Sequence, residues 1–280
     1  MATPHLTHVA DPDDPRLSDY RDLTDAAARR AVEVDGRDGC VIVEGVLALD
    51  RVLAAGATLR SVLVTPSRAA SLADLLACVP AGVPVLVAER GVLRDVTGFD
   101  VHRGVLASAA RAPVPAAAAV LGPARRVLVG EGLNDHENLG ALFRNAAATG
   151  LDAVALDDRS ADPWYRRSVR VSLGWAAVLP HTRIGALPAG YDLLRSHGFR
   201  VVALTPGPDG VAVDEATAAG LLDDPVALVV GAEGPGLSAG AIDAADVRVR
   251  VPMPDGVDSL NVATALAVVA SFAAAHRGWT

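Results

Sequence analysis

Residues 226–238 read Val-Ala-Leu-Val-Val-Gly-Ala-Glu-Gly-Pro-Gly-Leu-Ser, an apolar run that leads directly into a glycine-rich turn. An apolar run without alternation is typical of a strand in a parallel sheet that is covered on both faces. Ligands bind to such sheets beyond the carboxyl ends of the strands. The stretch therefore predicts an α/β fold, and residues 231–238 are a candidate binding loop.

The second half of the chain repeats this alternation of strands and helices. Further strands are expected at residues 126–129, 153–157, 178–182, 200–205 and 246–251, with a last helix at 260–276. Strands that alternate with helices form parallel sheets, so residues 125–280 are expected to form one α/β domain.

The first half predicts a smaller α/β domain. Strands are expected at residues 39–45, 59–65 and 83–87, separated by helices at 23–30, 46–55 and 70–78. We assign residues 21–111 to this domain and residues 1–20, which are rich in Asp and Pro, to an irregular leader. Residues 112–124 are rich in Ala and Pro without a period, and are expected to be a linker.

The composition indicates a cytoplasmic globular protein. Of the 280 residues 51% are hydrophobic, and the mean hydropathy of +0.33 counts against disorder. The most apolar stretch, residues 262–275, is short and contains Thr264 and Ser271, so it predicts a buried helix and no membrane span. No signal peptide is expected, and Cys40 and Cys78 lack the spacing of a zinc site.

All 25 basic residues are arginines, which excludes a lysine Schiff base, a P-loop lysine and a lysine general base. The formal net charge of −8 counts against a protein coated in nucleic acid, but phosphate recognition needs only a local patch. Arg166, Arg167 and Arg170 form such a patch, with Trp164 and Tyr165 beside them. We predict that the arginines bind RNA, with a solvated helix face as the alternative.

A dinucleotide-binding loop is an alternative for residues 127–132, an apolar strand that ends in Gly130 and Gly132. The fingerprint of that loop requires a third glycine where this chain has Asp135. An acid at a helix start also opposes a pyrophosphate there. An NAD-dependent enzyme is therefore the weakest of the functions considered.

Polar groups stand at three strand-to-helix junctions of the second half. They are Asn138 and Arg144 around Gly140, Glu233 in the glycine-rich loop, and Ser259 and Asn261 before the last helix. Each has a simpler explanation: a surface helix with a solvated arginine, a tight turn, and a helix N-cap. Arg144 has apolar neighbours in sequence, and a charge in apolar surroundings needs an anionic or hydrogen-bonding partner. Junctions at one edge of a sheet favour a single site.

In their order and spacing, these segments resemble the motifs of the SpoU/TrmH family of RNA ribose 2′-O-methyltransferases, within the SPOUT class. The family patterns are N-x-G-x-x-x-R, then G-x-E-G-x-G-L, then I/V-P-M ending in S-L-N-V. They match residues 138–144, 231–237, and 251–253 with 259–262. The first half is similar to the L30e-like substrate-binding domain often fused to these enzymes, at residues 43–45 and less clearly at 102–107.

The resemblance implies a trefoil-knotted α/β domain that binds S-adenosylmethionine and acts as a homodimer on RNA, with ribosomal RNA favoured over transfer RNA. It implies no membrane partner and no metal. It assigns the cofactor pocket to Thr205, Gly231, Val251 and Leu260. A non-catalytic RNA-binding or ribosome-assembly factor with the same fold is the alternative from another class.

The resemblance also assigns catalytic roles to Arg144, Asn138, Glu233, Ser259 and Asn261. Arg144 is the residue proposed to activate the ribose hydroxyl. Because a guanidinium stays protonated in proteins, we expect Arg144 to hold a phosphate and stabilise developing negative charge rather than to remove the proton. Asn138, Ser259 and Asn261 are expected to orient the nucleotide, and Glu233 to brace the loops.

Overall fold

The computed structural model describes residues 6–24 and 39–277. The chain divides into two compact units. The first consists of Met1–Ala112 with Trp164–Val178, and the second of Pro113–Pro163 with Leu179–Thr280. Residues 164–178 therefore leave the domain of residues 125–280 that their position in the sequence predicts.

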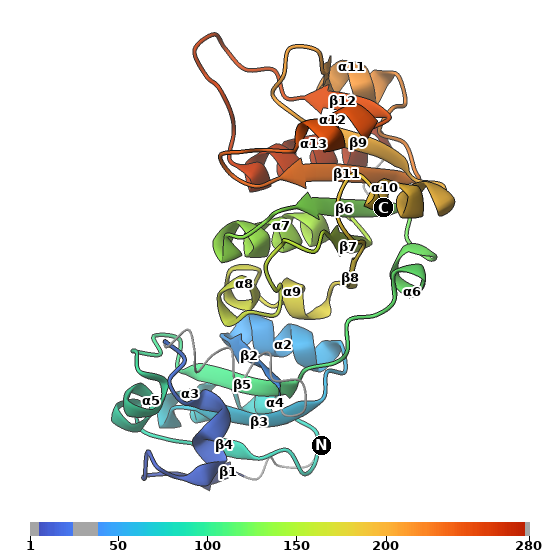
Figure 1. Ribbon diagram of the computed structural model, residues 1–280. Coiled ribbons are helices and arrows are strands. Elements are labelled where there is room, and N and C mark those ends of the chain that lie inside the picture. Colours follow the sequence, from blue (N-terminus) through green and yellow to red (C-terminus); the bar gives the residue numbers. More distant parts are fainter. Residues whose placement is uncertain (1–5, 25–38, 278–280) are drawn as a thin grey trace. The chain divides into compact units, whose positions relative to one another are not determined.

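The first unit contains a five-stranded sheet in the order β1-β4-β3-β5-β2. Its strands are β1 (Leu6–His8), β2 (Cys40–Glu44), β3 (Leu59–Val64), β4 (Val85–Val87) and β5 (Val105–Ala110). β1, β4 and β3 run parallel, while β5 pairs antiparallel with β3 and β2 (Figure 1). The expected strands near β2, β3 and β4 are confirmed. β5 was not expected, because its alanines and serine have a weak preference for strands.

The helices that the structure describes in the first unit are short. They are η1 (Pro15–Tyr20), α2 (Val46–Ala54), α3 (Pro66–Ser71), α4 (Ala73–Leu76), α5 (Arg90–Thr97), α8 (Arg166–Val171) and α9 (Trp175–Val178). The helix expected at 70–78 is interrupted and ends at Leu76: α3 and α4 are separate because Leu72 lies outside helical geometry, with φ −118° and ψ 23°. The expected helix at 23–30 falls mostly outside the described residues.

The segment of α8 and α9 packs on the N-terminal elements. α8 contacts β2, and α9 contacts α2. Between α8 and α9, a Cβ added at Gly174 would lie 2.8 Å from the Cα of Ala48, so only glycine permits this close approach to α2. This segment belongs to the first unit because it packs there, although in sequence it lies between two strands of the second unit.

The irregular leader expected at residues 1–20 is wrong where the structure describes it. β1 adds a parallel strand beside β4, and η1 follows. Pro15 begins η1, and the Asp14 side chain caps it by accepting a backbone hydrogen bond at 2.8 Å. Leu17 and Tyr20 are three residues apart, share one face of the 3₁₀ helix and are fully buried. Here Asp and Pro start a helix instead of marking an irregular tail.

The second unit contains a seven-stranded sheet in the order β10-β12-β9-β11-β6-β7-β8. Its strands are β6 (Arg126–Glu131), β7 (Ala153–Leu156), β8 (His181–Arg183), β9 (Arg200–Leu204), β10 (Val211–Ala212), β11 (Val226–Gly231) and β12 (Val247–Arg250). Every pairing in it is parallel, as the apolar runs predicted (Figure 1). The strand expected at 178–182 begins later, because Val178 ends α9.

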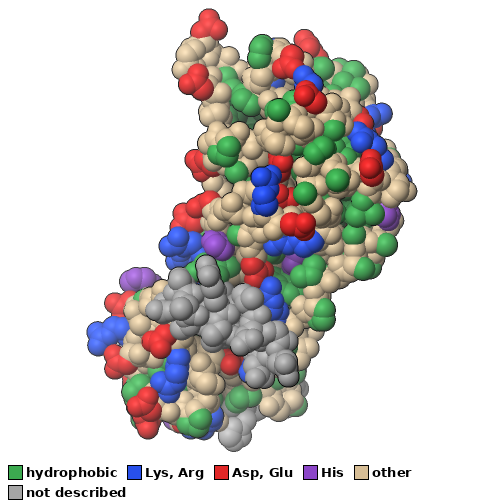
Figure 2. Space-filling view, in the orientation of Figure 1, with side chains coloured by type: hydrophobic (Ala, Val, Ile, Leu, Met, Phe, Trp, Pro, Cys, Tyr) green, Lys and Arg blue, Asp and Glu red, His purple; other side chains and the backbone are tan. Residues whose placement is uncertain are grey.

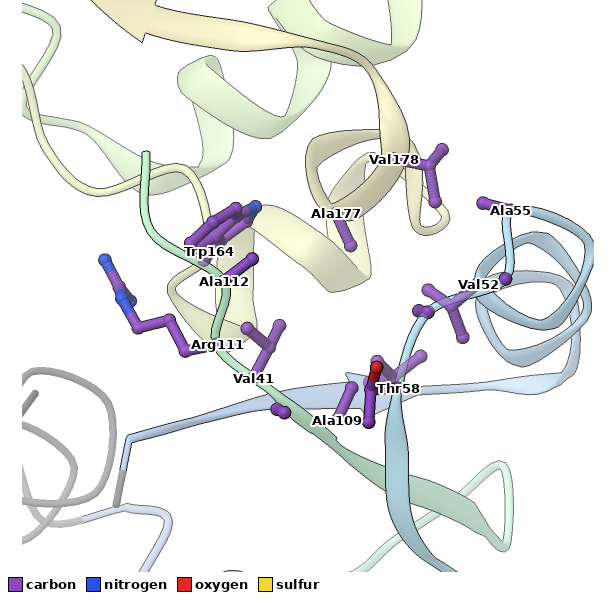
Figure 3. Close-up of a pocket in the computed structure, with 14 residues that line it drawn as sticks. Val41, Val52, Ala55, Thr58, Ala109, Arg111, Ala112, Trp164, Ala177 and Val178 are labelled. Atoms are coloured by element: carbon purple, nitrogen blue, oxygen red, sulfur yellow. The ribbon is translucent and has the colours of Figure 1, made fainter. Parts of the chain in front are cut away.

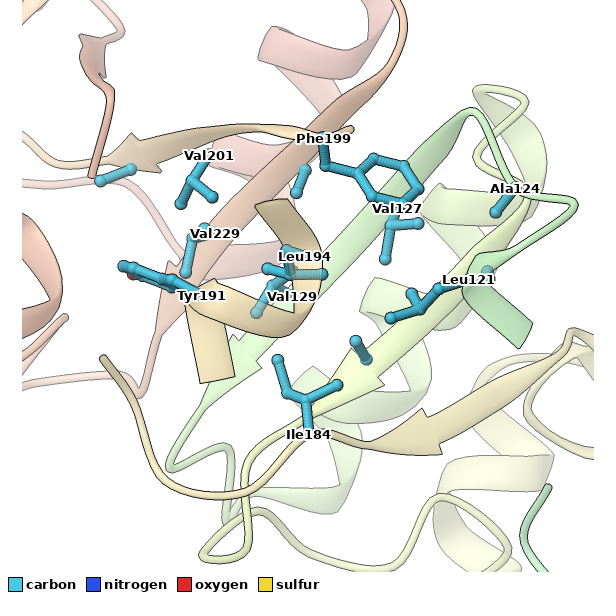
Figure 4. Packing of buried hydrophobic residues seen from close by; sticks show 14 of the residues in the cluster. Leu121, Ala124, Val127, Val129, Ile184, Tyr191, Leu194, Phe199, Val201 and Val229 are labelled. Carbon is cyan, nitrogen blue, oxygen red and sulfur yellow. The ribbon is translucent and has the colours of Figure 1, made fainter. Parts of the chain in front are cut away.

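Helices cover both faces of this sheet, which is why its strands are apolar throughout. They are α6 (Ala117–Leu121), α7 (His136–Ala148), α10 (Gly190–Ser196), α11 (Val213–Ala218), α12 (Ala239–Ala244) and α13 (Val262–Arg277). On one face, Val127, Val129 and Val229 pack with Tyr191 and Leu194 of α10 (Figure 4). On the other, α13 contacts β11 and α7. In the described part of the chain, no helix has the length and apolarity needed to cross a membrane.

The linker expected at residues 112–124 is wrong in its C-terminal part. Residues 117–121 form α6, whose Val120 and Leu121 belong to the core of the second unit. The alanines of this stretch favour a helix, with Pro113 and Pro115 before it and Pro123 after it. The boundary between the units falls between Ala112 and Pro113.

Candidate functional site

The three polar segments predicted from the sequence follow three strands of the parallel sheet in the second unit. β6 leads to α7, β11 leads through residues 232–238 to α12, and β12 leads through residues 251–261 to α13 (Figure 1). β11 and β6 are hydrogen-bonded neighbours, and β12 is separated from β11 by β9 alone. All three loops therefore leave the same carboxyl edge of the sheet, where ligands bind in this class of fold.

Asp135 sets the direction in which α7 leaves the sheet. Its side chain accepts hydrogen bonds from the N–H groups of Glu137 and Asn138 at 2.9 and 2.7 Å, so it is the N-cap of α7. The position that lacks the third glycine of a dinucleotide-binding loop thus carries a helix cap. The cap fixes Asn138 in the first turn of α7, facing the neighbouring loops.

The side-chain amide of Asn138 joins the three loops. Its Nδ2 donates to Glu233 Oε2 at 2.5 Å, and its Oδ1 accepts from Asn261 Nδ2 at 2.8 Å. Asn261 is oriented in turn, because its Oδ1 accepts from the N–H of Ala263 at 3.0 Å and caps α13. The chain Glu233–Asn138–Asn261 confirms that the three segments lie together.

Glycine is required where the loop after β11 folds back on its own strand. A Cβ added at Gly231 would lie 2.1 Å from the carbonyl carbon of Gly236, a distance that no side chain permits. The Gly236 N–H donates to the carbonyl of Ala232 at 2.9 Å and closes the turn. At Gly234, by contrast, an added Cβ would meet no atom within 4 Å, so the backbone there faces open space.

The predicted cofactor residues follow adjacent strands at this edge. Thr205 follows β9, Gly231 ends β11 and Val251 follows β12. The Thr205 N–H donates to the Val249 carbonyl at 3.0 Å, which ties the first loop to β12. Leu260 lies just before α13, and its side chain is 37% exposed. Their part in cofactor binding stays a prediction.

Two predicted catalytic residues stand outside the hydrogen-bonded chain. Ser259 is exposed in the loop before α13. Arg144 lies six residues beyond Asn138, so the two side chains project from different sides of α7. The apolar surroundings expected for Arg144 are wrong: its side chain is exposed, and no described residue forms a hydrogen bond or an ion pair with it. The guanidinium is thus available to an external anion.

Residues 125–271 match the family model of the SpoU rRNA methylases. The chain belongs to the SpoU rRNA methylase family. The matched region contains all three segments that meet at the carboxyl edge, so the family assignment and the observed hydrogen bonds concern the same residues.

Relatives and solved structures agree with the SpoU assignment. An uncharacterized tRNA/rRNA methyltransferase of Mycobacterium tuberculosis is 48% identical over 260 residues, 93% of this chain and 88% of the relative. The 23S rRNA (guanosine(2553)-2′-O)-methyltransferase RlmP of Bacillus subtilis is 35% identical over 149 residues, 53% of this chain and 58% of that enzyme. An AdoMet-bound rRNA methyltransferase from Sinorhizobium meliloti has the same fold, with a TM-score of 0.76 at 22% identity over 97% of this chain and 98% of its own.

The arginines predicted to bind RNA in this SpoU protein have unequal environments on α8. Arg166 Nη1 lies 2.5 Å from Glu44 Oε2, and the two side chains are only 13% and 7% exposed. Its guanidinium also lies over the Phe99 ring at 4.4 Å. Arg167 is exposed and Arg170 half-buried. Arg166 therefore ties α8 to β2, and an RNA contact by these arginines stays a prediction.

Of the two aromatic residues beside these arginines, Trp164 is not open for base stacking. Trp164 is 8% exposed, and the Arg111 guanidinium lies over its ring at 4.9 Å. Trp164 forms one wall of a pocket of about 390 Å³ in the first unit, whose other walls are mostly valines and alanines (Figure 3). None of the predicted site residues lines this pocket.

On the face shown in Figure 2, arginines stand among acidic side chains and do not gather into one positive patch.

Residues that the motif patterns missed support the loops of the SpoU site. Glu131, the last residue of β6, accepts hydrogen bonds from the backbone N–H and the hydroxyl of Ser238, both at 2.8 Å. Asp157, the first residue after β7, accepts from the Gly132 N–H at 2.9 Å. Asp157 therefore holds the loop after β6. The signal in the sequence was an acid at the end of an apolar strand.

Proposed function

We propose that this SpoU protein transfers the methyl group of S-adenosylmethionine to a ribose 2′-hydroxyl of RNA, and that ribosomal RNA is its substrate. That it is an S-adenosylmethionine-dependent RNA methyltransferase follows from its family. The finer assignment is supported by the chain Glu233–Asn138–Asn261, which gathers the three segments at one edge. The Bacillus subtilis relative, a 23S rRNA 2′-O-methyltransferase, supports the same choice.

The loops after β9, β11 and β12 fit a nucleoside cofactor. Gly234 and Gly236 leave open space over the backbone, so main-chain amides and carbonyls can approach a base. Thr205, Gly231, Val251 and Leu260 would hold S-adenosylmethionine there. When bound, the cofactor would supply an electrophilic methyl group, and neighbouring apolar side chains would exclude competing water.

The remaining residues would act on the acceptor nucleotide. The ribose oxygen forms a bond to the methyl carbon as the bond from that carbon to sulfur breaks, and the hydroxyl proton leaves. Arg144 is exposed and free of described partners, so it can hold the adjoining phosphate and stabilise charge on the oxygen. Since arginine stays protonated, the proton passes to phosphate or water. Asn138, Ser259 and Asn261 would orient the ribose while Glu233 braces the loops.

A homodimer belongs to the same proposal. α13 carries apolar residues around most of its circumference, and Phe272 on it is 41% exposed. A helix that is apolar on its solvent side is typical of an interface. Sedimentation equilibrium would test this part, and a monomer at micromolar concentration would contradict it.

The proposed reaction is tested with labelled S-adenosylmethionine. The protein is incubated with ribosomal RNA, transfer RNA and intact ribosomal subunits, and the labelled nucleotide is mapped by its resistance to alkaline cleavage. We expect a ribose 2′-O-methyl group in ribosomal RNA. Label on a base, or in transfer RNA alone, would contradict the proposal. Calorimetry with S-adenosylmethionine separates the non-catalytic alternative, because a factor that only binds RNA need not bind the cofactor.

A further inference from the structure

The loop that follows β7 carries an arginine held by two buried carboxylates. Arg159 Nε lies 3.2 Å from Asp157 Oδ2, and Arg159 Nη2 lies 3.1 Å from Glu131 Oε1. The Asp157 and Glu131 side chains are 0% and 3% exposed, whereas the Arg159 side chain is 66% exposed. The guanidinium therefore lies at the surface with its acidic partners beneath it.

Hydrogen bonds from other residues of the second unit hold both carboxylates in place. Asp157 Oδ1 accepts from the Ser160 hydroxyl at 2.6 Å and from the Gly132 N–H at 2.9 Å. Glu131 accepts from the backbone and hydroxyl of Ser238. Burial opposes the charge of Asp157, but the hydrogen bonds from Ser160, Gly132 and Arg159 outweigh it and lower its pKa. Two immobile acids hold the plane of the guanidinium in one orientation.

Much of the hydrogen-bonding capacity of Arg159 remains unused. A guanidinium has five N–H groups, and the two ion pairs engage its Nε and one side of Nη2. The part of the chain that the structure describes supplies no other partner for Arg159. A mobile surface arginine loses side-chain entropy when it binds an anion. The ion pairs with Asp157 and Glu131 already order the Arg159 side chain, so anion binding costs less entropy here. The exposed N–H groups form a preorganised site for an oxyanion.

Arg159 lies on the acceptor side of the candidate site. β7 neighbours β6, which neighbours β11, so the loops bearing Arg159, Asn138 and Glu233 leave adjacent strands (Figure 1). Neighbouring strands are about 4.8 Å apart, so these loops lie on the order of 10 Å from one another. The predicted cofactor loops follow β9, β11 and β12, on the other side of β6. An anion at Arg159 would thus lie beyond the acceptor nucleotide and not in the cofactor pocket.

We propose that Arg159 binds a backbone phosphate of the RNA and so positions the acceptor strand at the site, an inference that rests on the proposed function. A planar guanidinium with adjacent free N–H groups matches two phosphate oxygens, and such charge-assisted pairs are among the stronger hydrogen bonds. Glu131 and Asp157 act through Arg159 by orienting it. The same acids hold the loops after β6 and β11, so the phosphate site and the reacting groups share one rigid support.

The test compares Arg159→Ala and Arg159→Lys with wild type, and uses Arg195→Ala as the matched control. Arg195 is also an exposed, ion-paired arginine of the second unit, but its partner Asp246 accepts from the Val201 N–H at the opposite, amino end of the sheet. In vitro transcribed 23S rRNA and bulk transfer RNA serve as the probes. Three quantities are measured: the RNA Kd over a range of salt, the KM for RNA against kcat, and the calorimetric Kd for S-adenosylmethionine.

We expect Arg159→Ala to raise the RNA Kd and KM about tenfold, with kcat and the S-adenosylmethionine Kd within twofold of wild type. The slope of log affinity against log salt should fall by about 0.7 to 0.9, the value of one phosphate contact. Arg159→Lys should keep the slope while losing part of the affinity, because it keeps the charge without the planar fork. Arg195→Ala should behave as wild type, and all variants should have melting temperatures close to it.

Unchanged RNA affinity and salt slope in Arg159→Ala would overturn the inference. So would an equal loss of S-adenosylmethionine affinity, since that result assigns Arg159 to the support of the loops or to the cofactor. If Arg159→Ala does not fold, the salt slope and affinity of Arg159→Lys decide the question. A wild-type protein that transfers no methyl group to either RNA contradicts the proposed function instead, and its RNA Kd still tests Arg159. Inorganic phosphate should compete with RNA for binding to the wild-type protein more strongly than for binding to Arg159→Ala. Equal competition in the two proteins would also count against the site.

Discussion

The side-chain amide of Asn138 donates a 2.5 Å hydrogen bond to the carboxylate of Glu233, which lies 95 positions further along the chain. The oxygen of the same amide accepts from Asn261. A primary amide can donate and accept at once, and neither a carboxylate nor a hydrocarbon side chain can replace it in both bonds. The orientation of Asn138 and the spacing of three loops are therefore fixed together.

Replacing Asn138 with alanine removes both hydrogen bonds and should lower methyl transfer at saturating RNA by at least tenfold. The melting temperature should change little, because the bonds lie near the surface and each contributes about 0.5–1.5 kcal/mol. Initial rates with labelled S-adenosylmethionine measure the effect. Asn134→Ala is the control, since Asn134 is exposed in the loop just before α7. Equal rates for the two variants would remove Asn138 from the site.

Gly231→Ala should destabilise the loop after β11, because its Cβ would lie 2.1 Å from the carbonyl carbon of Gly236. Relief requires a backbone shift, and overpacking of this kind costs about 1–3 kcal/mol. We expect a lower melting temperature and a loss of S-adenosylmethionine binding by calorimetry. In Gly240→Ala the added Cβ meets Pro188 at an ordinary 3.6 Å. That control should retain both properties, and a Gly231→Ala variant that matched it would contradict the close approach.

Arg144→Ala should lose methyl transfer by about 10²–10³-fold, the usual effect of removing a group that stabilises developing charge. Binding of S-adenosylmethionine should persist, since Arg144 is exposed and forms no hydrogen bond or ion pair with a described residue of the cofactor loops. Single-turnover rates and calorimetry measure the two quantities. Arg125→Ala, an exposed arginine at the amino end of β6, is the control. Near-normal turnover of Arg144→Ala would refute its assignment.

Asp157 should make part of the unfolding free energy of the protein depend on pH. Its pKa in the folded state is lowered, because hydrogen bonds from Ser160, Gly132 and Arg159 outweigh the opposing effect of burial. The stabilisation is complete above the unfolded-state pKa of about 4 and is lost as the pH falls through the lower folded-state value. The free energy of unfolding, measured with denaturant, should fall less between pH 6 and pH 2 in Asp157→Asn than in the exposed control Asp158→Asn. Identical pH profiles would contradict this.

Leu17→Ala tests whether the N-terminal segment belongs to the core of the first unit. Leu17 is fully buried, so its truncation should cost about 2–5 kcal/mol in unfolding free energy. Leu47→Ala removes a leucine that is 53% exposed and should cost far less. Urea unfolding followed by circular dichroism compares the two. Equal midpoints would mean that the segment does not contribute to the core.

Local patterns predicted most strands of the second unit, because an unbroken apolar run is a local signal of a strand that is covered on both faces. The run from Val226 to Val230 is apolar on both faces, and the observed β11 is covered on both faces. Because the strands run parallel, their carboxyl ends lie at one edge, so polar residues after β6, β11 and β12 were expected to meet. Asn138, Glu233 and Asn261 do so.

The same local patterns failed where a partner distant in sequence decides the outcome. Asp and Pro near the N-terminus predicted an irregular leader. Tyr20 of this segment is nevertheless buried, and its hydroxyl donates a hydrogen bond to the carbonyl of Ser61, a residue distant in sequence. Residues 164–178 lie between two strands of the second sheet in sequence and pack on the first unit. Periodicity describes which face of an element is apolar, but it does not say what covers that face.

The parallel α/β sheet, the three loops at its carboxyl edge and their resemblance to one family could be predicted before folding was considered. Each depends on residues that are close together in the chain. The folded chain was needed to show that Arg144 faces solvent, that Arg166 pairs with Glu44, and that Arg159 is oriented by two buried acids. The environment of a charge depends on the neighbours that folding brings within a few ångströms. Those neighbours come from strands and helices far apart in the sequence.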